Sequence, residues 1–259
     1  MTQTYAAPLW ALAAYGVFAT HDVIVKFLGA VYSPFQIIFF GVLLGFPLLM
    51  ISLLRDQTVG TLIPCHPYWS AARTLAAVIA ASSAFYAFSV LPLAETYALI
   101  FASPLIITML SIPVLGETVG IRRWLAVLVG LGGVLWVLQP GASALTLGHA
   151  AALTCAAAGA FAAIVVRKIG RDERTVVLML YPMVANFVLM GALMPFVYRP
   201  MPIEDLGAML CVSLLALLAG NFLIRAYRHG EAAVIAPMQY SQILWAAIYG
   251  ALFFGENPS

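Results

Sequence analysis

Long apolar stretches, separated by short polar connections, follow one another along the whole chain. Each is close to the length of about 20 residues that an α-helix needs to cross a bilayer core of roughly 30 Å. A membrane barrel would instead need strands of about 10 residues with alternating polarity. The pattern therefore predicts an all-α polytopic membrane protein with nine helices in this chain, near residues 8–29, 34–54, 70–91, 94–115, 121–138, 147–167, 175–197, 206–226 and 232–254.

The stretch over residues 85–118 is repeated in pattern at residues 224–257, at an offset of 139 positions. Only five of the 34 aligned pairs are identical, so the pattern carries the argument. In each copy a polar or Pro-bearing start leads into an apolar run, which stops at Gly116 and Glu117 or at Gly255 and Glu256. Because repeats decide the fold, we predict two repeats, over residues 1–140 and 141–259.

A repeat of five helices crosses the membrane an odd number of times, so the second copy must begin on the opposite side. This is the inverted repeat of many secondary transporters. The first copy has a fifth helix after Glu117, whereas the sequence stops three residues after Glu256. We therefore expect ten helices in two inverted five-helix repeats, the tenth within about 20 to 35 further residues that are missing from this sequence.

Composition agrees with a membrane protein: 64% of the residues are hydrophobic and 8% charged, against about 25% charged in soluble domains. Lys26 and Arg199 are the only basic residues on the side of the membrane opposite the N-terminus. The positive-inside rule then predicts a cytoplasmic N-terminus, in a bacterial inner membrane. The other ten basic residues follow the second, fourth, sixth and eighth helices: Arg55, Arg73, Arg122, Arg123, Arg167, Lys168, Arg171, Arg174, Arg225 and Arg228.

Several kinds of chemistry lack their sequence signatures. The four histidines and three cysteines are scattered without metal-ligand spacing. There is no phosphate-binding Gly-Lys-Ser/Thr loop, no nucleophile elbow and no sizeable soluble domain. We therefore expect no enzyme activity, no cofactor, no metal and no nucleic-acid partner. An intramembrane enzyme would need a clustered catalytic set, and a channel would need a regular pore-lining pattern.

The first helix carries charges at membrane depth. Asp22 and Lys26 share one face, four residues apart. Ionisable groups within a membrane indicate a substrate site or a proton relay by default, so we predict that both line a cavity and that Asp22 is the candidate for a coupling proton. The alternative is that the two side chains neutralise each other, or that Lys26 reaches the interface.

Other polar and aromatic side chains complete the candidate substrate site. Asn221 and Arg225 share a face of the eighth helix, and Arg suits a carboxylate or a phosphate. Gln242 and Trp245 form an amide and aromatic face of the ninth helix, as a small-molecule pocket requires. The alternatives are helix–helix joining for the polar groups and interfacial packing for the aromatic ones. The predicted substrate-binding residues are Asp22, Lys26, Tyr86, Tyr97, Asn221, Arg225, Gln242 and Trp245.

The recurring Gly-Glu pairs favour a structural interpretation. Gly commonly ends a helix, and the following carboxylate, Glu117 or Glu256, would satisfy free amides at the start of the next helix. Gly41 and Gly45 lie four residues apart in the second helix, which favours close helix packing.

The stretch PLAETYALIFASPLIITMLSIPVLGETVGIRRWLAVLVGLGGVLWVLQPG resembles the first-half hallmark of the EamA family in the drug/metabolite transporter superfamily. The second-half stretch VIAPMQYSQILWAAIYGALFFGENP is similar to the subgroup that includes S-adenosylmethionine uptake carriers. This resemblance implies ten helices, two inverted repeats, cytoplasmic termini and a cavity lined by helices 1, 3, 4, 6, 8 and 9. Two positions depart from the family pattern: Ile243 replaces a common Pro, and Gly41 replaces a basic residue.

These observations together predict a secondary active transporter that moves a small organic metabolite across the inner membrane by alternating access. Its substrate would be an amino acid or a similar zwitterion or amine, bound between helices 1, 3, 4, 8 and 9. The alternative is a carrier for S-adenosylmethionine or another nucleoside-type or flavin-type metabolite. The expected partners are the substrate and the lipid bilayer, and a homodimer is possible.

Overall fold

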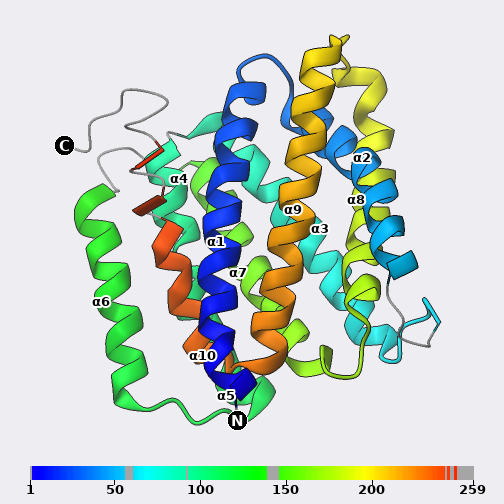
Figure 1. The fold of residues 1–259 in the computed structure, drawn as a ribbon. Coiled ribbons are helices and arrows are strands. Elements are labelled where there is room, and N and C mark those ends of the chain that lie inside the picture. Colours follow the sequence, from blue (N-terminus) through cyan, green and yellow to red (C-terminus); the bar gives the residue numbers. More distant parts are fainter. Residues whose placement is uncertain are drawn as a thin grey trace.

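The structure, a computed structural model, describes residues 2–55, 61–91, 93–138, 146–242, 244–245 and 248–249. In these residues the secondary structure is helical, without strands (Figure 1). The elements are α1 (Thr2–Gly29), α2 (Pro34–Arg55), α3 (Pro67–Val90), α4 (Leu93–Ile100), α5 (Ser103–Leu115), α6 (Ile121–Leu138), α7 (Leu147–Ile169), α8 (Thr175–Val197), α9 (Ile203–His229), α10 (Ala232–Ile235) and the short 3₁₀-helix η1 (Ala236–Tyr240). The predicted all-α class is confirmed.

Six spans among the described residues are long and apolar enough to cross a bilayer: Ala6–Gly29, Pro34–Ile51, Thr96–Leu115, Leu147–Ile169, Thr175–Val197 and Ile203–His229. Large apolar side chains also cover the outside of the bundle, where Leu54, Phe196 and Ile203 are each about four-fifths exposed. A water-soluble protein rarely shows such a surface. The chain is therefore a multi-pass membrane protein.

Two of the predicted helices are interrupted. The fourth divides into α4 and α5, because Pro104 has no amide hydrogen to continue the helix from Ile100. At this point the Ser103 hydroxyl donates a hydrogen bond to the Ala156 carbonyl of α7 at 3.1 Å. The ninth begins as the single turn of α10 and tightens into η1, which contains Pro237 near its start. Thr96–Leu115 still forms one membrane-length span, and α10 continues into η1 without a gap, so the prolines change the local geometry of the two predicted helices.

The helices pair across the two halves of the chain. The most extensive contacts join α1 to α9, α3 to α7 and α2 to α8. When each helix is exchanged for its counterpart in the other half, α1 for α7, α2 for α8 and α3 for α9, this set of pairs maps onto itself. Such a pattern is what a two-fold relation between repeats produces.

The ends of the helices show that the second copy is inverted. We call the end of the bundle where α1 begins the base; it carries the N label in Figure 1. Gly230, at the end of α9, lies against Ala7 near the start of α1. Arg167, near the end of α7, donates to the carbonyl of Arg228 at 3.3 Å. The base therefore holds the start of α1 and the end of its counterpart α7, so these helices run in opposite directions.

Side chains from both halves also meet at the end opposite the base. Gln36 is fully buried, and its side-chain amide exchanges two hydrogen bonds with the backbone of Arg199, at 2.6 and 2.8 Å. Nearby, Tyr32 donates to Asp205 at 2.5 Å. This hydrogen bond raises the pKa of Tyr32, which lies in the connection after α1, to about 12.

Candidate functional site

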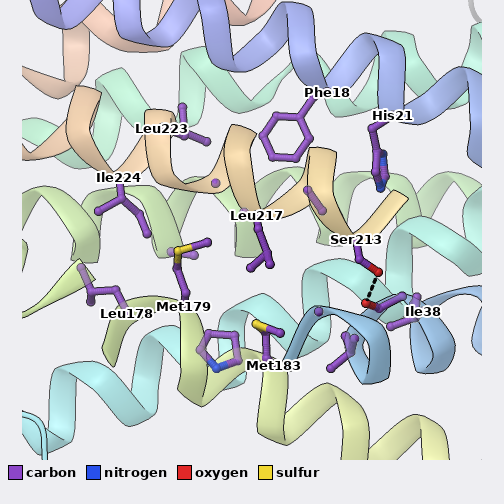
Figure 2. A pocket seen from close by; sticks show the side chains of 18 of the residues that line it. Phe18, His21, Ile38, Leu178, Met179, Met183, Ser213, Leu217, Leu223 and Ile224 are labelled. Carbon is purple, nitrogen blue, oxygen red and sulfur yellow. Dashed lines mark hydrogen bonds between the residues drawn. The ribbon is translucent and has the colours of Figure 1, made fainter. Parts of the chain in front are cut away.

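A cavity of about 470 Å³ lies in the centre of the bundle (Figure 2). Three helices of the first half, α1, α2 and α3, and their counterparts α7, α8 and α9 supply its lining residues. Its size falls within the range of about 300 to 1,000 Å³ that is typical of small-molecule sites. The two halves of the chain therefore build the cavity jointly.

Small residues create this space. Gly41 and Gly45 of α2, Gly159 of α7 and Gly220 of α9 all face the cavity. A Cβ atom added at Gly159 would meet nothing within 4 Å, and one at Gly41 would only touch Val212 at 3.9 Å. Gly45 is tighter, with Met183 at 3.0 Å from the same added atom. The cavity is hollow at Gly41 and Gly159 because side chains are missing there.

The cavity is long and follows the helix axes. On α9 its lining runs from Val212 to Tyr227, a separation of fifteen residues and about 22 Å of helix. Its walls are mainly apolar, with Phe18, Met179 and Met183 around the space in Figure 2. Thioether side chains are flexible and adapt to different ligand shapes. An elongated ligand with an apolar body fits such a space.

Few polar side chains reach the cavity. The hydroxyl of Ser213 is within 2.6 Å of the Gly41 carbonyl and 2.9 Å of the Met209 carbonyl, so it is satisfied within the protein. His21 lies toward the end opposite the base, and Arg73 lies toward the base. Among the described lining residues, these are the two whose side chains carry nitrogen atoms and can become positively charged.

Arg73 of α3 is one of the residues that line the cavity. Its Nη1 donates to the carbonyl of Leu178 on α8, while its Nε is buried without a hydrogen-bond partner among the described residues. The positive-inside count placed Arg73 in the connection after the second helix. In the structure α3 already begins at Pro67, and Arg73 is six residues inside it. The predicted helix over residues 70–91 already contained Arg73, so its count as a connection residue was the error.

His21 connects the cavity with the predicted residue Asp22. The His21 Nδ1 atom lies 2.9 Å from the Asp22 carboxylate, and Tyr97 of α4 donates to the other carboxylate oxygen at 3.4 Å. Tyr97 stacks on Phe101, with ring centroids 5.8 Å apart. Asp22 and Tyr97, predicted separately, are therefore brought together, one side chain away from the cavity lining.

Trp245, from the region after η1, lies on α1 away from this cavity. An added Cβ atom at Gly16 would touch the Trp245 indole at 3.4 Å. The Trp245 ring stacks on Tyr249 at 6.1 Å, and the Tyr249 hydroxyl is 3.0 Å from Thr20. Gln242 is partly buried in the same region.

The remaining predicted residues also lie outside the described lining. Arg225 is exposed, with its guanidinium 5.6 Å from the centre of the Trp10 ring. Asn221 lies about 40° from Arg225 around the axis of α9, about 60° from the cavity-lining Ile224 and about 100° from the cavity-lining Gly220. Tyr86 is 43% exposed. None of the eight predicted residues, Lys26 included, is among the described lining residues of this cavity, and their roles in substrate binding stay predictions.

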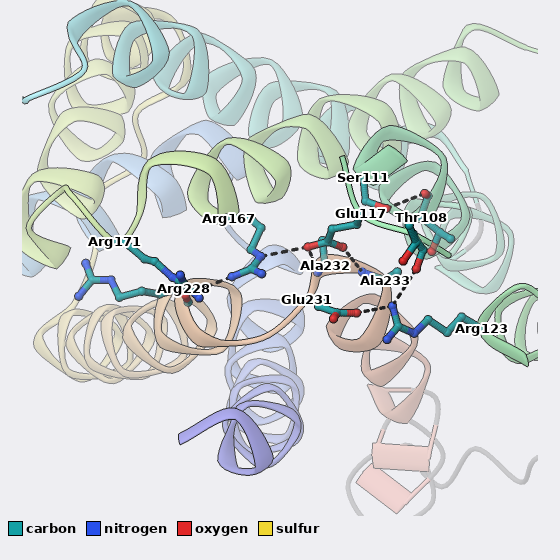
Figure 3. A network of polar contacts seen from close by, with 11 residues as sticks. Thr108, Ser111, Glu117, Arg123, Arg167, Arg171, Arg228, Glu231, Ala232 and Ala233 are labelled. Carbon is teal, nitrogen blue, oxygen red and sulfur yellow. Dashed lines mark hydrogen bonds and ion pairs between the residues drawn. The ribbon is translucent and has the colours of Figure 1, made fainter. Parts of the chain in front are cut away.

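An ion pair between Glu117 and Arg167 lies largely buried at the base (Figure 3). The Glu117 carboxylate accepts from Arg167 Nε at 3.1 Å and from the amides of Ala232 and Ala233 at 3.1 and 3.4 Å. The two charged side chains are only 9% and 17% exposed. Glu117 therefore caps the start of α10 and neutralises a cation of α7 at the same time.

The turn that carries Glu117 confirms one prediction and contradicts another. Gly116 ends α5 in the left-handed region at φ 68°, which confirms the predicted helix end. The prediction that the carboxylate caps the next helix along the chain is wrong, because it caps α10 of the other half instead of α6. Arg123 at the start of α6 pairs with Glu231, which is 45% exposed. Only the first of these two ion pairs is buried.

The sequence of the chain matches the model of the EamA-like transporter family twice, over residues 6–139 and 146–259. The chain belongs to this family. A solved crystal structure superimposes on the whole chain with a TM-score of 0.82, at 17% identity and over 90% of that structure's chain. This likeness supports the fold alone.

Characterised relatives of this EamA-family chain are named as transporters of different molecules. A pseudopaline exporter of Pseudomonas aeruginosa is 27% identical over 96% of this chain and 88% of its own. An S-adenosylmethionine uptake transporter of Rickettsia prowazekii is 22% identical over 96% and 84%. A riboflavin transporter of Rhizobium johnstonii is 26% identical over 75% and 65%. The relatives of this chain thus include one named as an exporter and one named as an uptake transporter.

Proposed function

We propose that this protein is a secondary active transporter that moves a small organic metabolite across the bacterial inner membrane by alternating access. The observation that carries this proposal is the central cavity, which three helices of each inverted half line together. In many carriers the substrate site lies at such a repeat interface, and one half moves against the other. The N-terminus and the basic residues at the base would face the cytoplasm.

The two ends of the bundle supply contacts that such a cycle would make and break in turn. At the base, Glu117 and Arg167 join α5, α7 and α10. At the opposite end, Gln36 joins α2 to the connection between α8 and α9. Each set crosses between the two halves, so rocking of one half against the other would strain one set at a time.

Asp22 is the proposed site of the coupling proton, with His21 as its contact to the cavity. The two side chains are in hydrogen-bond contact at 2.9 Å, and His21 is among the residues that line the cavity. In liposomes with an imposed pH gradient, Asp22→Asn should lose the dependence of uptake on external pH while still exchanging substrate. Unchanged pH dependence in this variant would remove Asp22 from the coupling mechanism.

The substrate would be an amino acid or a similar zwitterion or amine. Relatives named for S-adenosylmethionine and riboflavin transport favour a larger nucleoside-type or flavin-type metabolite as the second candidate. A panel of both classes can be screened by thermal stabilisation of the purified protein, because a ligand that binds the folded state raises the melting temperature by mass action. Trp245→Ala and Asp22→Ala would test whether the predicted residues contribute, and the mass of the purified particle would test the possible homodimer.

Transport itself is tested by blocking the cavity. Gly159 faces the cavity with open space at its Cβ position, so Gly159→Trp should fill it and lower substrate counterflow in liposomes at least about 10-fold. Gly159→Ala is the matched control and should transport normally, with a melting temperature that is equal or slightly higher because alanine favours a helix by about 0.5–1 kcal/mol. Normal counterflow in a folded Gly159→Trp protein would show that substrate does not pass through this cavity.

A further inference from the structure

Among the described residues that line the cavity, Arg73 carries the one guanidinium group, and no ion pair is found for it there. It has five donors, of which Nη1 bonds to the Leu178 carbonyl and Nε is buried without a partner. No carboxylate pairs with it among the described residues. Arg167, by contrast, has the Glu117 carboxylate at 3.1 Å. Burying an unpaired charge costs free energy. An anion from outside the protein would therefore stabilise the Arg73 side chain.

We propose that Arg73 binds a carboxylate of the transported molecule, so that the cavity selects monoanionic or zwitterionic substrates with an apolar body. This inference rests on the proposed transport function and names the substrate group at the same site. Arginine presents planar donors that match a carboxylate. Because the described lining places one guanidinium at this end, a single negative charge balances it better than a doubly charged phosphate does.

The rest of the lining sets the shape of that substrate. Beyond Arg73 the walls are formed by residues such as Met179, Met183 and Leu217, and Ser213 is engaged with backbone carbonyls. His21, toward the other end, is in contact with the Asp22 carboxylate. The carboxylate of the substrate would therefore point toward the base, while its apolar part lies along the slot toward Phe18.

N-acetyl-phenylalanine and its amide form a suitable pair of probes. They have nearly the same size and the same apolar ring, but only the acid is anionic at neutral pH. Dissociation constants can be measured for the full-length purified protein by titrating each probe and following thermal stabilisation. We expect the acid to bind at least about 10-fold more tightly than the amide, the low end of what charge-assisted hydrogen bonds contribute.

Three variants identify the residue responsible. Arg73→Gln should lower affinity for the acid to that for the amide and leave the amide affinity unchanged. Arg73→Lys should keep part of the preference, because it keeps the charge but loses the planar donors. Arg171→Gln is the control: Arg171 is exposed at the base, where its Nε donates to the Arg228 carbonyl at 3.3 Å, and its loss should leave the preference intact.

Several outcomes would overturn the inference. Equal affinity of the wild-type protein for acid and amide, or no binding of either probe, would do so even if Arg73→Gln fails to fold. An equal loss of both probes in Arg73→Gln would indicate a structural role for the side chain. Failure of the transport proposal is distinct: it would show as absent counterflow, whereas failure of this inference leaves counterflow in place without any preference for acids.

Discussion

Removing the Glu117 carboxylate should destabilise the base of the bundle more than any change to an exposed ion pair there. Glu117→Ala would leave Arg167, which is 17% exposed, without its carboxylate, and the amides of Ala232 and Ala233 without their acceptor. Breaking a buried ion pair costs about 3–5 kcal/mol, and losing a helix cap costs about 1 kcal/mol. Since both side chains keep some exposure, we expect about 3 kcal/mol in total, which is less than the sum for a fully buried pair.

Thermal unfolding of the purified protein in detergent, followed by tryptophan fluorescence, measures this loss. A change of about 3 kcal/mol corresponds to a fall in melting temperature of roughly 6–12 °C, on the scale of domains of 150–250 residues. Glu117→Gln keeps an oxygen acceptor for the amides and should lose about half as much, because only the charge is gone. Adding Arg167→Met to Glu117→Ala should cost little more, since the uncompensated cation is then absent.

The matched control is Glu231→Gln, which breaks the neighbouring ion pair with Arg123. Glu231 is 45% exposed, and its side chain does not cap α10. Exposed pairs contribute about 0–1 kcal/mol, so the melting temperature should change by less than about 4 °C. Equal shifts in Glu117→Ala and Glu231→Gln would refute the reasoning, because burial would then not distinguish the two pairs.

Two further predictions concern helix contacts and pH. Gly148→Ala places a Cβ atom 2.7 Å from Val90 and should lower the free energy of unfolding by about 1–3 kcal/mol through overpacking. Gly207→Ala is the control: nothing lies within 4 Å of its Cβ position, so the change should be neutral or stabilising by up to about 1 kcal/mol. Similar melting temperatures for the two variants would contradict this prediction. Tyr32→Phe should lower the melting temperature equally at about pH 6 and about pH 9, because the pKa of about 12 in the folded protein and about 10 in the unfolded chain both lie above this range. The stabilisation is present below the unfolded pKa and is lost only as the pH rises through about 12, so a Tyr32→Phe effect that varies between these two pH values would argue against the hydrogen bond to Asp205.

Apolar runs of about 20 residues sufficed to predict the helices, because each run must satisfy its own backbone in lipid. The division at Pro104 and the change to 3₁₀ geometry around Pro237 were not predicted, although a proline inside a helical pattern is a known signal for an irregularity. Gly41 and Gly45 were interpreted as close packing. An added Cβ atom would meet Met183 at 3.0 Å at Gly45 but only Val212 at 3.9 Å at Gly41, whose carbonyl is nevertheless in contact with Ser213 of α9 at 2.6 Å.

The candidate site was harder to predict, because it depends on which helix faces meet. Asp22 was recognisable as a charge at membrane depth, and the structure brings Tyr97 to it. Arg73 was counted with the basic residues of the connections, although it already lay within the predicted helix over residues 70–91, and α3 contains it. No local pattern could have paired Glu117 with α10, since the partners are 115 positions apart.

That separation also orders the assembly of the protein during synthesis. A helix usually begins with a cap from its own first residues, but Glu231 makes no side-chain cap at the start of α10. The acceptor for the Ala232 amide, Glu117, is synthesised 115 residues earlier. It can pair with Arg167 once α7 is made, but it can bind α10 only after α8 and α9 have also been made. The cap at the start of α10 can therefore form only after the intervening helices have been made, so this contact links a residue of the first half to one that is synthesised much later.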